Sequence, residues 1–418
     1  MKKFLFMLAA AVMVIVGCNK KDKPEQGTKY LKLDEPSGAN CIVVNDAESH
    51  SIDVTVRGNG VQPDGLTDRA FQSLNLTAEI TDTKLIWEGE PGWITTLSFN
   101  SDKKSIEFAT KGTPGNALVG GYSQYGVLLW SWHVWSPGSG IDPGSVNLGA
   151  TSAEYDNPGV LGFLYQWGRK EPFPSGIKLQ YTKEEAAPHA VATLYGPDGE
   201  PVKWSHPTAF NASTICSPGG VIQEPLMFMG TDSFGMGSDP VRGTGDYISG
   251  ETGFDDLWGG VSGKKTMLDP CPAGYKVGRL ADFNLTKELI EKYDNVEWVG
   301  GKPVYHGTHI WHGSGWEFAA EGEPTIYLPA AGHYDDEKAN HYIAAELDKS
   351  NNYMNVVGYY WISDVAPNRK GRAFVFDSSN LHYSFAPESW DDSNILKNAM
   401  TIPSPRAAGY SVRCVKEK

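Results

Sequence analysis

The chain has 418 residues and a formal net charge of −14, and 40% of its residues are hydrophobic, 11% aromatic and 21% charged. An acidic chain of this kind is unsuited to binding nucleic acid through a basic surface, so nucleic acid is not an expected partner. The length suits two domains, and the 47 glycines and 26 prolines favour a loop-rich β architecture.

The first residues have the pattern of an export signal. Lys2 and Lys3 precede an apolar run over 4–16 that is too short to remain as a membrane-spanning helix, and a glycine stands directly before Cys18. A small residue followed by cysteine is what a lipoprotein signal peptidase requires. We therefore predict a signal peptide over 1–17 and lipid attachment at Cys18. The alternative is an ordinary secretory signal in which the cysteine is accidental.

The next part of the chain changes from polar to β-patterned. Residues 18–28 are mainly polar and charged, so we predict a flexible tether. Alternation of apolar and polar residues predicts strands over 51–56, 84–88 and 105–109, a hairpin loop over 100–104 and a second hairpin over 116–135. We expect a β-sandwich-like domain over 29–136. A stretch dense in glycine and proline follows and predicts a boundary, with the second domain over 137–418.

The cysteines bear on the same division. Four of them follow Cys18, namely Cys41, Cys216, Cys271 and Cys414, and an exported chain meets an oxidising compartment. Three connectivities exist. We favour Cys271–Cys414, because a bridge between these two residues of the expected second domain would constrain a long loop. Cys41 lies in an apolar run, so it is either a small buried residue or a partner of Cys216.

The second half has a mixed pattern. Asp282 or Asn284 is placed to cap a short helix that ends near Tyr293. Short strands are predicted over 325–329, 358–363, 372–377 and 410–415, with long loops between them. The predicted fold class is therefore mainly β, with an α+β C-terminal part.

Several motifs carry a resemblance to a known family. Asp269–Val277, Gly358–Asp364 and Ala408–Val415 resemble the Fibrobacter succinogenes major paralogous domain, and upstream motifs that include Leu164–Pro174 are similar to Bacteroidales surface lipoproteins. The sequence departs from the family at Gly278, where the family usually has proline, and in the additional Cys216.

The resemblance implies several further properties. It implies a C-type-lectin-like fold for 137–418 and, again, a disulfide between Cys271 and Cys414. It also implies a lipid-anchored protein of the outer membrane, exposed at the cell surface. Some family members resemble tip or adhesin modules of fimbriae, so fimbrial subunits join glycans and proteins as expected partners.

Aromatic and acidic loop residues are the candidate ligand-binding residues. Trp311 and Trp316 lie in one stretch rich in glycine and histidine, and Trp390, Asp391 and Asp392 lie together further on. The fold that the chain resembles often binds sugars through calcium held by loop carboxylates, so calcium is the one cofactor considered, and no metal site is assigned. The alternatives are packed tryptophans and solvated acidic turns.

No catalytic constellation is found. The segment 260–266 imitates a phosphate-binding loop, but Trp258 stands where its first glycine is needed and Lys265 replaces the hydroxyl residue. The expected function is therefore a non-enzymatic surface-binding or adhesion lipoprotein for glycan or protein ligands. One alternative is an accessory or tip subunit of a fimbria, and another is an enzyme on a scaffold like that of the formylglycine-generating enzyme.

Overall fold

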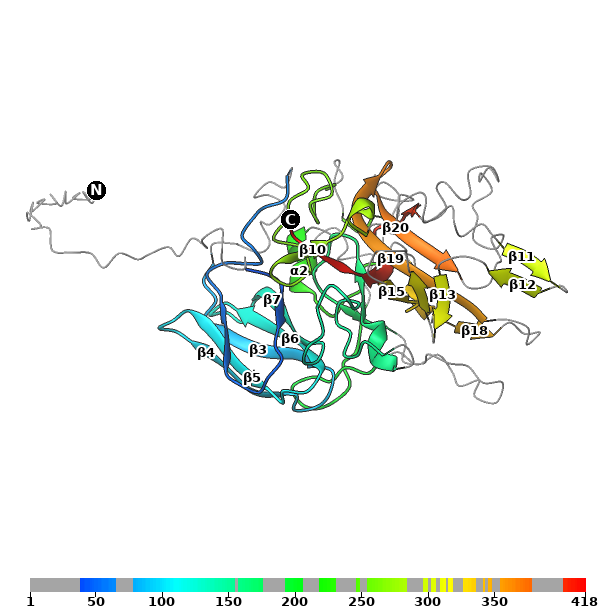
Figure 1. Ribbon diagram of the computed structural model, residues 1–418. Coiled ribbons are helices and arrows are strands. Elements are labelled where there is room, and N and C mark those ends of the chain that lie inside the picture. Colours follow the sequence, from blue (N-terminus) through cyan, green and yellow to red (C-terminus); the bar gives the residue numbers. More distant parts are fainter. Residues whose placement is uncertain are drawn as a thin grey trace, which may run out of the picture. The chain divides into compact units, whose positions relative to one another are not determined.

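The chain divides into two units, Met1–Pro36 and Ser37–Lys418. The computed structural model describes residues 38–64, 78–154, 157–175, 192–205, 218–230, 246–248, 254–283, 296–299, 302–305, 309–312, 315–318, 326–335, 341–342, 345–347, 354–377 and 401–418. All of these belong to the second unit, so the predicted signal peptide, Cys18 and the tether lie outside the described residues. The second unit is mainly β and contains several sheets, as expected (Figure 1).

The first sheet is four-stranded. Its order is β1 (Cys41–Val43), β7 (Leu128–Ser136), β6 (Gly115–Tyr122) and β3 (Asp82–Glu88), with β1 parallel to β7 and the other pairs antiparallel. Every residue of β7 is buried, including the polar Ser131, His133 and Ser136, so both faces of this strand are covered. Trp130, Trp132 and Trp135 of β7 are fully buried, so all three belong to the core.

The second sheet is three-stranded and antiparallel. Its order is β2 (His50–Asp53), β5 (Ser105–Thr110) and β4 (Ile94–Asn100), which leaves β4 at one edge. The predicted hairpin loop between β4 and β5 is confirmed. The Oδ1 of Asn100 accepts hydrogen bonds from the backbone N–H of Asp102 at 3.1 Å and of Lys103 at 3.0 Å.

The remaining strands follow β7 in the chain, and few helices occur among the described residues. Nine strands form one large sheet, namely β8 (Phe163–Gln166), β9 (Phe173–Pro174), β16 (His333–Tyr334), β17 (His341–Tyr342), β18 (Ala345–Leu347), β19 (Met354–Ala366), β20 (Lys370–Asp377), β21 (Thr401–Ser404) and β22 (Gly409–Val412). Three smaller groups are β10 (Tyr275–Val277) with β23 (Cys414–Lys416), β11 (Val296–Val299) with β12 (Lys302–Tyr305), and β13 (His309–His312) with β14 (Gly315–Phe318) and β15 (Ile326–Pro329). The helical segments within the described ranges are η2 (Pro158–Leu161), α2 (Pro218–Gln223) and η4 (Leu280–Phe283).

The described residues test the predicted helices only in part. The predicted helix up to residue 293 lies outside the described residues beyond η4. Within the described ranges, none of the helices is both long enough and apolar enough to cross a bilayer.

One hydrophobic core extends across the predicted boundary at residue 136. It contains residues from the four-stranded sheet and from the three-stranded sheet of β2, β5 and β4, together with Trp167, Trp258 and Tyr410. Asn40 joins the two parts directly, since its Nδ2 donates to the carbonyl oxygens of Met267 at 2.7 Å and of Asp269 at 2.8 Å. The boundary at 136 therefore does not separate two compact units. The glycine- and proline-rich stretch after β7 makes turns within a single unit.

The predicted disulfide is confirmed. Cys271 and Cys414 are bonded, with their Cα atoms 5.9 Å apart and a sequence separation of 143. In the chain-entropy model a loop of this length gives about 5 kcal/mol of stabilisation. Cys41 is a free thiol in the core, and burial raises its pKa. This agrees with its interpretation as a small buried residue, and Cys216 lies outside the described residues.

Candidate functional site

The predicted ligand-binding residues are only partly described. Trp390, Asp391 and Asp392 lie outside the described residues. Trp311 in β13 and Trp316 in β14 stand directly opposite each other in the antiparallel register. The structure therefore brings this pair of sequence positions together on two paired strands, where the sequence analysis expected a loop. Among the residues that the structure describes, no group of three or more histidine, cysteine or carboxylate side chains is placed to hold a metal ion.

A groove opens beside the three-stranded sheet, and we call it the Arg57 groove. Its volume is about 690 Å³. The described residues that line it are Val54, Thr55, Val56, Arg57, Gly60, Gln62, Ala78, Glu79, Ile80, Lys104 and Met267. These come from the segment after β2, the segment before β3, the loop before β5, and a distant loop of the second half.

The groove has an apolar wall. Val54, Ile80 and Met267 are each buried to at least nine-tenths of their surface and still line it. Val54 continues the alternation of β2, in which Ile52 also faces the core. This wall is suited to an apolar group of a ligand.

Two glycines position the loop that closes one side of the groove. Gly58 has a φ of +55°, and a Cβ at this position would lie 2.4 Å from the carbonyl oxygen of Met267. Asn59 Nδ2 donates to the carbonyl oxygen of Lys265 at 2.8 Å, and the N–H of Met267 donates to the carbonyl oxygen of Val61 at 2.7 Å. The Gly-Asn-Gly turn is therefore fixed against the loop that supplies Met267.

Charged side chains complete the lining. Arg57 is 8% exposed and donates through Nη2 to the carbonyl oxygen of Ala78 at 2.6 Å. Burial lowers the pKa of Arg57, but a guanidinium remains a cation at neutral pH. Lys104 and Glu79 form an ion pair of 2.7 Å at the open side, and the hydrogen bond from Lys104 lowers the pKa of the Glu79 carboxyl. The groove thus combines an apolar wall with charged groups.

A second group of charged residues is closed to solvent. Lys170 donates to Ser131 Oγ at 2.6 Å and lies 2.6 Å from Glu171, and Arg169 Nε donates to Glu171 at 3.2 Å. All three charged side chains are at most 2% exposed. Burial alone would raise the pKa of Glu171, but Lys170 and Arg169 lower it overall. Arg169 also donates to the carbonyl oxygens of Met227 and Glu224, so this Glu171 cluster connects β7, the segment after β8 and the loop after α2.

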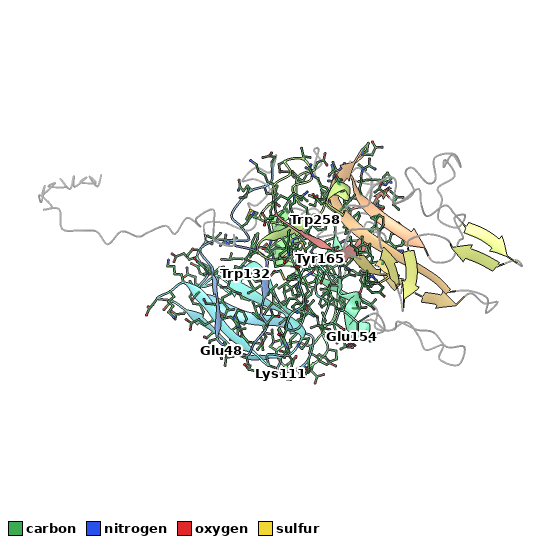
Figure 2. The ribbon with its side chains drawn as sticks, viewed as in Figure 1. Glu48, Lys111, Trp132, Glu154, Tyr165 and Trp258 are labelled. Atoms are coloured by element: carbon green, nitrogen blue, oxygen red, sulfur yellow. A yellow bond between two sulfur atoms is a disulfide. The ribbon has the colours of Figure 1, made fainter. Side chains whose placement is uncertain are left out.

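Two other candidates for chemistry also belong to the scaffold. His133 in β7 is 2% exposed, its Nε2 is 2.8 Å from Asn116 Oδ1, and burial lowers its pKa to about 3. Lys265, in the segment that imitates a phosphate loop, donates to the carbonyl oxygens of Cys271, Pro272 and Tyr275 at 2.9, 2.6 and 2.5 Å. Its amine is therefore used to hold the chain beside the disulfide. Figure 2 shows Trp132, Tyr165 and Trp258 among these packed side chains, with Glu48 and Lys111 at the periphery.

Comparisons with known proteins add no name to this site. No family model, no curated protein and no solved structure matches the chain.

The groove was missed by the sequence analysis. Its residues come from distant segments, and neither Arg57 nor Met267 belongs to a motif. The only local signal was the Gly58-Asn59-Gly60 turn, which marks a sharp change of direction but no ligand.

Proposed function

We propose that this chain is a non-enzymatic, lipid-anchored binding protein of the bacterial cell surface whose ligand is a polypeptide. The Arg57 groove carries this proposal. Its volume lies within the usual range for binding sites, and its lining combines apolar side chains with a few polar groups. Among its described lining residues there is no aromatic side chain, and stacking on aromatic rings is the usual way to bind a sugar. An extended peptide suits this lining better than a glycan.

The proposed architecture is a β-sandwich-like part followed by a C-type-lectin-like part of the Fibrobacter succinogenes major paralogous type. Two observations support it. The two small sheets contribute to one core, and the disulfide joins the cysteines of the two motifs that carry the resemblance. The buried ionisable groups described above are bonded within the scaffold, which favours binding over catalysis.

The groove can be tested on cells with a photo-crosslinking amino acid at Gln62. This exposed residue lines the groove, and Glu48, also exposed, is a matched control away from it. We expect irradiation to give adducts that contain a second polypeptide at position 62 and none at position 48. Equal adducts at both positions, or none at either, would contradict the proposal. An adduct that contains only carbohydrate would show that the ligand of the groove is a glycan.

Membrane attachment is tested separately. Cells that carry Cys18→Ala are grown with a fatty-acid analogue and then fractionated. We expect the variant to lose the label and to leave the membrane fraction, since one cysteine carries the lipid. A variant that still partitions with membranes would show that Cys18 is not the anchor.

A glycan site near β13 and β14 is the second candidate, because the register places Trp311 opposite Trp316. It is tested by glycan-array binding with calcium and with a chelator. Calcium-dependent binding that is lost in Trp316→Ala and Asp391→Ala would support this site. Silence across the array would leave the polypeptide ligand as the better proposal.

A further inference from the structure

The outer edge of β4 has free hydrogen-bonding groups. Among the described strands, β4 pairs only with β5, at one edge of the three-stranded sheet. The N–H of Val54 donates to the carbonyl of Lys104 at 3.1 Å, and the N–H of Lys111 donates to the carbonyl of Trp93 at 2.9 Å. In an antiparallel ladder the backbone groups of successive residues point alternately to the two neighbouring strands. These two bonds therefore set the direction of every backbone group along β5.

The direction along β4 follows from the register. Alternate residues of β5, from Ser105 onward, direct their N–H and C=O groups toward β4, and their partners are Asn100, Ser98 and Thr96. The backbone groups of Leu97 and Phe99 must then point away from β5, toward the open edge. Among the described residues, no hydrogen bond from another segment reaches them. Two donors and two acceptors are thus left for another strand.

The side chains of β4 do not protect this edge. Proteins usually discourage strand pairing with charged residues or proline at an edge. No residue from Ile94 to Asn100 is charged or proline. The edge strand β3 of the first sheet differs, because Asp82 and Lys84 project from it with side chains 53% and 57% exposed. Its last residue, Glu88, is also covered by reciprocal backbone hydrogen bonds with Tyr195.

We propose that two copies of this chain associate through antiparallel pairing of their β4 strands, centred on Ser98. In this register Leu97 lies opposite Phe99 of the second copy, and the four free N–H groups and four free C=O groups of the two strands form four hydrogen bonds. Ser98 meets its own counterpart on the two-fold axis. Such an interface is self-complementary, as closed dimers require.

The side chains and the strand ends fit the same register. Leu97 and Phe99 are partly buried against the core, so their pairing across the interface continues an apolar inner face. Antiparallel pairing also places the loop that carries Lys103 of one copy beside the start of β4 of the other copy, just after Glu90. The side chain of Lys103 is 71% exposed, and that of Glu90 is 63% exposed. Lys103 and Glu90 are each paired within their own copy, with Glu107 and Lys111, so they bring no unpaired charge to the strand ends, and no charge within β4 meets its own copy. These features favour a second copy over an unrelated strand.

Cysteine substitution tests the register in the full-length protein in detergent. Directly opposite residues in an antiparallel pair have Cβ atoms about 5 Å apart, so Ser98→Cys should give a disulfide-linked dimer under mild oxidation. In the matched variant Thr96→Cys the two thiols would be four positions out of register, about 13 Å apart, and no cross-link should form. Failure of Ser98→Cys to cross-link in the folded protein would overturn the proposal. Equal cross-linking by the two variants would overturn it as well.

A charge at the axis provides a second measurement. Ser98→Lys places two ammonium groups opposite each other at an exposed position, and we expect dimer association in sedimentation to weaken at least tenfold. Ser51→Lys adds the same charge to exposed β2, at the opposite edge of the sheet, and should leave association unchanged. Equal association of Ser98→Lys and the unmodified protein would overturn the proposal.

Discussion

The Glu171 cluster and the Arg57 groove contain the same types of residue but use them in opposite ways. In the cluster, arginine, lysine and glutamate are at most 2% exposed and bond to each other and to backbone carbonyls. In the groove, Lys104 and Glu79 meet at the open side, with side chains 53% and 71% exposed. The charged groups of the cluster are bonded within the chain itself, whereas the groove exposes charges and an apolar wall to the outside.

This difference shows why a charged motif alone does not identify a binding site. Buried charges must find partners within the fold, because an unpaired one costs several kcal/mol. A binding site has the opposite requirement, since its groups must remain accessible to a ligand. The two regions should therefore respond differently to substitution, with large losses of stability in the scaffold and changes of binding without loss of stability at the groove.

The largest loss is expected at the disulfide. Replacing Cys271 and Cys414 together by serine should lower the free energy of unfolding by about 5 kcal/mol, because the unfolded chain gains freedom over a loop of 143 residues. Denaturant unfolding measures this change. A reductant should have no further effect on the double variant. A loss below about 1 kcal/mol would show that the bridge does not constrain the fold.

Glu171→Gln tests the cluster itself. The substitution keeps the shape but leaves Arg169 and Lys170 buried without their counter-charge, so we expect a loss of about 3–5 kcal/mol in the free energy of unfolding. Lys103→Ala, which breaks the exposed pair with Glu107, should change stability far less. Similar losses of stability in the two variants would show that the buried charges of the cluster and the exposed ion pair do not differ in their contribution.

His133 extends the test to pH. Its pKa is lowered to about 3 in the folded protein, so the unfolded chain binds a proton near the ordinary value of 6.5 and the folded chain does not. Stability from the neutral imidazole is therefore complete above about pH 6.5 and is lost as the pH falls, by about 2 kcal/mol at pH 5. Asp269, whose pKa is raised to about 6, acts in the opposite direction over part of this range.

The contribution of His133 is isolated by comparison with His133→Gln. The glutamine variant keeps the Asp269 contribution but has no imidazole to protonate. Between pH 7 and pH 5, the free energy of unfolding should therefore fall by about 2 kcal/mol less for this variant than for the unmodified protein, as measured by denaturant unfolding. Parallel pH profiles would show that His133 is not held neutral by the core.

Much of the fold could be predicted because its signals are local. The Asn100–Lys104 turn, the alternation in β5 and the cysteine pair each depend on a few residues or on a single covalent bond. The core continues across the predicted boundary at 136, because glycine and proline mark a turn whether or not the core ends there. Asn40 bonds to Met267 and Asp269 across more than 200 residues, and no local pattern shows such a contact.

The site was less predictable than the fold for the same reason. The groove wall joins Val54, Ile80 and Met267, each of which looks like an ordinary core residue in its own segment. Lys265 illustrates the reverse case, because a motif that imitated nucleotide binding places its amine on three backbone carbonyls. Only the packed fold shows which apolar residues border a groove and which polar residues are hydrogen-bonded in the interior.

The smallest effect on stability, and the clearest contrast with Glu171, is expected at Gln62. Gln62→Arg adds bulk and charge at an exposed residue of the groove, where no buried group loses a partner, so the free energy of unfolding should change by less than about 0.5 kcal/mol. Capture of a polypeptide by a photo-crosslinker at Thr55, another exposed lining residue, should nevertheless fall when Gln62 is arginine. A stable variant with undiminished capture would place the ligand elsewhere, while a strongly destabilised one would show that the groove is part of the closed scaffold.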